Sequence, residues 1–104
     1  MAEPPPAAAD VLVLRQDMTI TREEFLRSVS GAVGYVAFTT AGDELRFAGD
    51  GRAWRIALAA LPDLALGMFR LPRHRVEVFL TGYDDDAARR FVERFELYFR
   101  RGGG

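Results

Sequence analysis

The chain has 104 residues, 49% of them hydrophobic, and a formal net charge of −1, which indicates one globular domain with a modest core. Cysteine is absent, so disulfides, thiolate nucleophiles and cysteine-ligated metals are excluded. The small net charge creates no overall field that would attract nucleic acid or an anionic membrane, so such binding would need a local patch. All 14 basic residues other than histidine are arginine, so Schiff-base and P-loop lysines are excluded. This usage is typical of a GC-rich, bacterial genome.

Residues 1–17 are predicted to form a flexible N-terminal extension, with a short strand at 11–15 as the alternative. The N-terminus shows no signal-peptide pattern, and no apolar run reaches the length of a membrane span. We therefore expect a cytoplasmic protein without membrane contact. A single α+β domain is expected at residues 18–101, followed by a disordered tail at 102–104.

A short helix is predicted to begin after Thr21. Thr21 and Glu24 have the spacing of a capping box, in which each side chain accepts a hydrogen bond from the other residue's backbone N–H. Phe25 and Val29 then share one helical face. Gly31 is placed where a glycine in the left-handed conformation can end the helix.

Residues 34–61 are predicted to form three strands, with a tight two-residue turn at Asp50-Gly51. This turn places apolar pairs on one face of the hairpin, as a half-buried sheet requires. It pairs Gly49 with Arg52, Phe47 with Trp54 and Leu45 with Ile56. It also places Arg46 opposite Arg55, which is unfavourable unless another group neutralises them.

Residues 64–82 are predicted to form a second hairpin, whose loop is the four residues Pro72 to Arg75. This loop matches each cross-strand pair in polarity or sign: Leu71 with Val76, Arg70 with Glu77, Phe69 with Val78 and Met68 with Phe79. Arg73, His74 and Arg75 would then lie at an exposed tip.

The last element is predicted to be a long amphipathic helix. Asp84, Asp85 and Asp86 supply the negative charge that a helix N-terminus favours. Arg100 and Arg101 complement the C-terminal end of the helix dipole. An apolar stripe runs between them at a spacing of three to four residues: Ala87, Ala88, Phe91, Val92, Phe95, Tyr98 and Phe99.

These elements predict a two-layer α+β fold. An antiparallel meander sheet of about five strands would have the short N-terminal helix and the long amphipathic C-terminal helix packed on one face. The opposite face would be partly apolar, which suits a protein partner or a second copy. It would carry Arg46, Arg55, Leu66, Met68, Arg70, Glu77 and Phe79.

The sequence predicts no catalytic, cofactor-binding or metal-binding residues. His74 is the sole histidine, and the serines that could pair with it, Ser28 and Ser30, fall on the first helix. The aspartates at 84–86 are interpreted as a helix cap, and Glu77 as the ion-pair partner of Arg70. The glycines at 49 and 51 precede a strand, whereas a phosphate loop precedes a helix.

We therefore expect a non-enzymatic interaction or accessory domain that acts through the open sheet face or the hairpin, on a protein partner or by self-association. The candidate interaction residues are Arg46, Arg55, Leu66, Met68, Arg73, His74, Arg75 and Phe79. The first alternative is an anion- or RNA-binding module that uses Arg46, Arg55, Arg73 and Arg75. A second is a small-ligand pocket between the long helix and the sheet.

Overall fold

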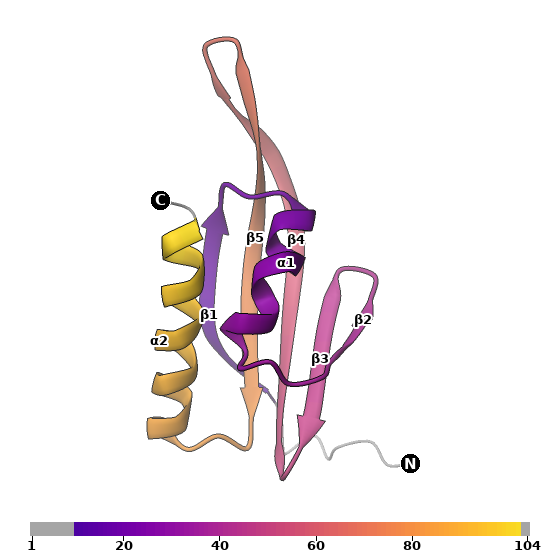
Figure 1. Ribbon diagram of the computed structural model, residues 1–104, viewed down its shortest axis with the longest axis vertical. Helices are drawn as coiled ribbons and strands as arrows, with labels where there is room; N and C mark the ends of the chain where they lie inside the picture. The colour runs from indigo at the N-terminus through magenta and orange to yellow at the C-terminus, as the bar shows by residue number, and fades with distance from the viewer. Residues whose placement is uncertain (1–9, 103–104) are drawn as a thin grey trace.

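Five strands and two helices lie between residues 10 and 102, the part of the chain that this computed structural model describes (Figure 1). In chain order they are β1 (Val11–Met18), α1 (Arg22–Ala32), β2 (Thr39–Ala41), β3 (Glu44–Gly49), β4 (Arg52–Leu66), β5 (Phe69–Thr81) and α2 (Asp85–Gly102). The strands form one antiparallel sheet in the order β1-β5-β4-β3-β2. The predicted α+β fold class is confirmed.

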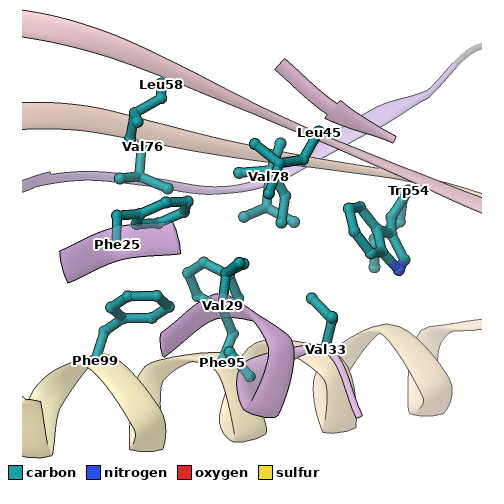
Figure 2. Close-up of a cluster of buried hydrophobic side chains, with 13 residues drawn as sticks. Phe25, Val29, Val33, Leu45, Trp54, Leu58, Val76, Val78, Phe95 and Phe99 are labelled. Atoms are coloured by element: carbon teal, nitrogen blue, oxygen red, sulfur yellow. The ribbon is translucent and has the colours of Figure 1, made fainter. Parts of the chain in front are cut away.

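Both helices pack on one face of the sheet, and the core lies between the two layers (Figure 2). Alternate residues of the central strands point into it because successive side chains of a strand face opposite sides. Phe25 of α1 stacks on Phe99 of α2 with ring centroids 4.9 Å apart, and Phe95 is fully buried beside them. The sheet contributes Leu45, Trp54, Ile56, Leu58, Val76, Val78 and Leu80.

The capping box of α1 is confirmed. The backbone N–H of Glu24 donates to the Thr21 hydroxyl, and the backbone N–H of Thr21 donates to the Glu24 carboxylate, each over 3.0 Å. The expected role of Gly31 is wrong, because the helix continues through it and the left-handed residues are Gly34 and Tyr35. Gly31 is instead buried, and a Cβ there would lie 2.3 Å from the Tyr98 ring.

The start of α2 follows the predicted cap. The Asp84 carboxylate accepts a hydrogen bond from the Ala87 backbone N–H over 2.7 Å, so it satisfies a donor that the first helical turn leaves free. Asp86 forms ion pairs with Arg89 and Arg90 one turn further on. Residues 103–104 of the expected disordered tail lie outside the described residues, and Gly102 belongs to α2.

The β3–β4 hairpin has the predicted register. Asp50 and Gly51 both adopt positive φ angles, 54° and 75°, as a type I′ turn requires. Phe47 pairs with Trp54 on the core face, and Arg46 lies opposite Arg55 on the other.

The predicted loop of the second hairpin is wrong. The turn is formed by Gly67 and Met68. Strand β4 continues through Pro62 to Leu66, and β5 begins at Phe69 and runs through Pro72. Gly67 has a φ of 58°, which suits the first central position of a type II′ turn. The observed pairs are Leu66 with Phe69, Ala65 with Arg70, Leu64 with Leu71 and Leu61 with Arg73. A bulge between Leu61 and Leu64 accommodates Pro62.

For residues 11–17 the alternative of a short strand is confirmed and the flexible extension is wrong, because Val11–Met18 forms the edge strand β1. It pairs with β5 from Val11 opposite Leu80 to Met18 opposite His74, with an irregularity between Leu12 and Leu14. Residues 1–9 lie outside the described part of the chain.

Candidate interaction surface

The sheet face opposite α1 and α2, here called the helix-free face, is formed by the residues that alternate with the buried ones. On β4 these are Arg55, Ala57, Ala59 and Leu61, and on β5 they are Arg73, Arg75, Glu77 and Phe79. None of the described helices covers this face (Figure 1). The ion pairs of its arginines determine which ligands this face could bind.

Glu44 neutralises the like-charged pair that the first hairpin creates. Its two carboxylate oxygens divide between Arg46, at 2.7 Å, and Arg55, at 3.0 Å. Asp10 contacts Arg55 from the other side at 2.9 Å. The hydrogen bond from Arg46 holds the pKa of Glu44 below its usual value, and that from Arg55 adds to the effect.

The arginines near β1 are paired in the same way. Arg15 donates to Glu77 over 2.7 Å, and Arg75 donates to Asp17 over 2.9 Å. Arg73 lies 3.6 Å from the same Asp17 carboxylate. The hydrogen bond from Arg75 lowers the pKa of Asp17, which keeps that carboxylate charged in neutral solution.

Phe79 is covered from the solvent side by an arginine. The Arg55 guanidinium lies 3.9 Å from the centre of the Phe79 ring, so the two form a cation–π contact within the helix-free face. Both side chains are half-buried. Phe79 is therefore less available to a partner than the sequence suggests.

The β4–β5 hairpin projects beyond the rest of the molecule (Figure 1). On β5 the pairing with β1 stops at His74, and on β4 the pairing with β3 stops at Ala57. Residues 61–73 therefore have no neighbouring strand on either side, and we call them the arm. The arm contributes no residue to the buried core.

One face of the arm is apolar. The cross-strand pairs Leu64–Leu71 and Leu66–Phe69 lie on the same side, because they are two residues apart on each strand. Met68 extends this surface at the turn and is 97% exposed, while Phe69 is 72% and Leu66 53% exposed. Alternation along β5 places Phe69 and Leu71 on the same side as Arg73 and Arg75, so the arm's apolar face continues the helix-free face.

The structure separates the predicted interaction residues into three groups. Arg46, Arg55 and Phe79 lie together on the helix-free face, as expected. Leu66 and Met68 were expected beside them but lie on the arm, because the turn falls at Gly67-Met68.

The basic residues expected at the hairpin tip lie at the base of the arm, within β5. Arg73 and Arg75 pair with Asp17, and His74 is half-buried. The His74 Nδ1 lies 2.8 Å from the Ile20 carbonyl oxygen, which can only accept, so that nitrogen carries the proton. The predicted ion pair of Glu77 with Arg70 is also wrong, since the partner is Arg15.

Sequence reasoning missed three residues of the arm's apolar face: Leu64, Phe69 and Leu71. The signal was present in the segment LALGMFRL, which alternates large apolar residues about a glycine. A turn at Gly67 pairs Leu66 with Phe69 and Leu64 with Leu71 at once. The predicted loop at Pro72 to Arg75 does not use this alternation.

Within residues 10–102, no cluster of His, Asp or Glu side chains has an arrangement that could hold a metal ion. The space between the helices and the sheet is filled by the aromatic core (Figure 2). An open depression runs along α2 instead, lined by Arg90, Glu93, Arg94, Leu97 and Tyr98. In the same part of the chain, no helix is long and apolar enough to cross a membrane.

Comparison with protein-family models, with curated proteins and with solved structures found no match to this chain. The functional argument therefore rests on the geometry of the arm and the helix-free face.

Proposed function

We propose that this chain is a non-enzymatic protein-interaction module that binds its partner through the arm. The observation that carries the proposal is an exposed apolar face on a projecting hairpin that contributes no residue to the buried core of residues 10–102. Its side chains expose on the order of 400 Å² together, which is as large as the largest apolar patch of a typical monomer. The largest apolar patch of a monomer is often a functional site.

The position of this surface supports the same conclusion. Exposing a side chain such as Phe69 forgoes roughly 2 kcal/mol of burial energy, and the body of the domain does not need the arm for its core. A hairpin that lies outside the core is accounted for, on this proposal, by what it contacts outside the molecule. Docking on a partner would bury these residues.

The anion- or RNA-binding alternative has less support. Arg46, Arg55, Arg73 and Arg75 each have a carboxylate within 3.6 Å, so a polyanion would have to displace those acids. Binding of mixed-sequence RNA at low salt that is lost with the changes Arg73→Ala and Arg75→Ala would favour this alternative.

A photo-reactive phenylalanine analogue placed at position 68 of the full chain tests the proposal in cells that express it. Position 97 on α2, where Leu97 is 49% exposed, is the matched control. We expect cross-linked adducts from position 68, whether to a second copy or to another protein, and their loss when Phe69 is changed to Glu. No adduct from position 68, or equal adducts from 68 and 97, would contradict the proposal.

A further inference from the structure

We infer that the partner of the arm is a second copy of this chain, and that each arm lies along the helix-free face of the other copy. This inference rests on the proposed docking role of the arm and specifies its occupant. The two copies would be related by a two-fold axis through the base of the arms, with their tips pointing in opposite directions. The helix-free faces would then meet as two packed sheets.

The helix-free face carries two small side chains where the arm's tip would lie. Ala57 and Ala59 alternate with the buried residues of β4, and we call them the alanine track. A methyl group is shorter than the charged side chains of the neighbouring strands, so the track leaves room for a bulky side chain of a second copy. The tip of the arm is bulky, because Met68 and Phe69 are the two most exposed large apolar residues of the described chain. A bulky tip over a row of alanines is sterically complementary.

The spacing along β4 is compatible with a two-fold axis. If the axis passes through the bulge at Pro62 and Asp63, Leu64 of one copy faces Leu61 of the other, and Leu66 faces Ala59. Phe69, which pairs with Leu66, then lies over the same part of the track. The eight residues from Ala59 to Leu66 span about 23 Å. Contact along this length buries roughly 600 Å² per copy, close to the lower bound for stable dimers.

The charges of the helix-free face allow two copies to approach. The face carries five arginines and four carboxylates, and these are arranged as neutralising pairs: Arg15, Arg46, Arg55, Arg73 and Arg75 with Asp10, Asp17, Glu44 and Glu77. Two such faces therefore meet with little net repulsion. Arg75 lies opposite Ala59, so the incoming Phe69 ring can stack on a guanidinium, as Phe79 does on Arg55.

Pairing of the arms edge to edge is the competing arrangement, and the prolines oppose it. Pro62 and Pro72 lie on the two strands at the base of the arm, and neither has a backbone N–H to donate to an added strand. The arm is therefore better suited to docking by its face than to strand addition.

Sedimentation equilibrium of the full chain from roughly 1 µM to roughly 100 µM is the first test. We expect a monomer–dimer equilibrium whose Kd rises at least tenfold with Phe69→Glu on the arm and with Ala59→Arg on the track. Leu97→Glu, on the exposed side of α2, is the control and should leave the Kd unchanged. A monomer at every concentration, or a dimer that neither change weakens, would overturn the inference.

Disulfide trapping tests the arrangement itself, because the chain has no cysteine of its own. A Leu66→Cys chain is mixed with an Ala59→Cys chain and oxidised. We expect a cross-linked dimer containing one chain of each kind, and little product from either variant alone. A disulfide between two Leu66→Cys chains would mean that the tips meet each other, and would overturn the arrangement.

Two outcomes separate self-association from docking of the arm on a different protein. A chain that stays monomeric in solution, yet forms arm-dependent adducts of a different mass from position 68, would contradict self-association alone. Absence of both the dimer and the adducts would contradict both proposals.

Discussion

At the scale of single residues, Glu44 stabilises the outer face of the first hairpin by pairing with both of its arginines. The tight turn at Asp50-Gly51 forces Arg46 against Arg55, and the Glu44 carboxylate lies between the two guanidinium groups. Like charges directly opposed across strands are destabilising, so the acid removes a cost that the turn creates. The sequence predicted the opposed arginines, but the residue that neutralises them became evident only in the structure.

We expect Glu44→Gln to lower the free energy of unfolding by about 1 kcal/mol, because it leaves Arg46 and Arg55 opposed without their shared partner. Urea unfolding at low salt measures the effect, and added salt should reduce it by screening the arginines. The matched control is Glu93→Gln, which affects an exposed acid 4.0 Å from Arg89. Equal losses for the two variants would contradict this role of Glu44.

Acid should weaken the fold through the same groups. Hydrogen bonds from arginines lower the pKa of Asp17 and of Glu44 from their ordinary values of 3.8 and 4.5. Their stabilising contribution is therefore complete above those values and is lost as the pH falls through the lower folded-state values. We expect unfolding free energies measured by urea titration to decline below about pH 4.5, and less steeply for the Asp17→Asn, Glu44→Gln double variant. Parallel declines would show that these two acids are not responsible.

Gly31 is required by packing and not by backbone conformation. A Cβ there would lie 2.3 Å from Cε2 of Tyr98, so Gly31→Ala should destabilise the fold by about 1–2 kcal/mol despite the better helix propensity of alanine. In a Tyr98→Ala background the clash is absent, and the same change should stabilise by about 0.5–1 kcal/mol. Thermal or urea unfolding of the four proteins measures both effects. The same sign in both backgrounds would refute the packing explanation.

At the scale of elements, the two hairpins show where sequence reasoning succeeds and where it fails. Asp50-Gly51 combines a strong turn signal with alternation that buries one face, and both pointed to the same register. For the second hairpin, the prediction requires a polar loop and therefore places Arg73, His74 and Arg75 at the tip. The observed tip is apolar instead, with Met68 97% exposed. A surface that breaks the usual pattern thus misled the prediction at the residues now proposed to bind.

The strand β1 was undecided from sequence for a different reason. Its partner, β5, is about sixty residues away, so nothing local to residues 11–18 fixes whether they pair. Its contacts with β5, such as Arg15 with Glu77, depend on the completed sheet. The helices were easier to predict because their caps and apolar stripes are local.

The arm should be removable without unfolding the body. Leu61 and Arg73 are cross-strand partners, so residues 62–72 can be replaced by Asn-Gly, a pair that forms a tight type I′ turn. Because no buried core residue is lost, we expect the amide spectrum of the remaining residues and the midpoint of thermal unfolding to change little. Self-association should disappear. A body that no longer folds would show that the arm is part of the domain's stability.

At the scale of the whole molecule, the core lies on one side of the sheet. Within residues 10–102 this leaves a sheet face that no helix covers and a projecting arm. The radius of gyration is 14.6 Å, larger than the roughly 13 Å of a compact chain of this size, and the long dimension of 50 Å includes the arm. Fold class, both helices and the first hairpin were predictable because their determinants are local. The arm was not, since none of its apolar residues belongs to the buried core of the described chain.

The most direct measurement follows the methyl signals of the methionines, of which the chain has three. Met68 lies at the arm's tip, whereas Met18 packs against the core and serves as the internal control. With ¹³C-labelled methyl groups, the signal of Met68 should shift and broaden as protein concentration rises, and Phe69→Glu should abolish this change. The signal of Met18 should stay where it is. A Met68 signal that remains sharp and unshifted at every concentration would contradict the account of the arm as a docking surface between copies.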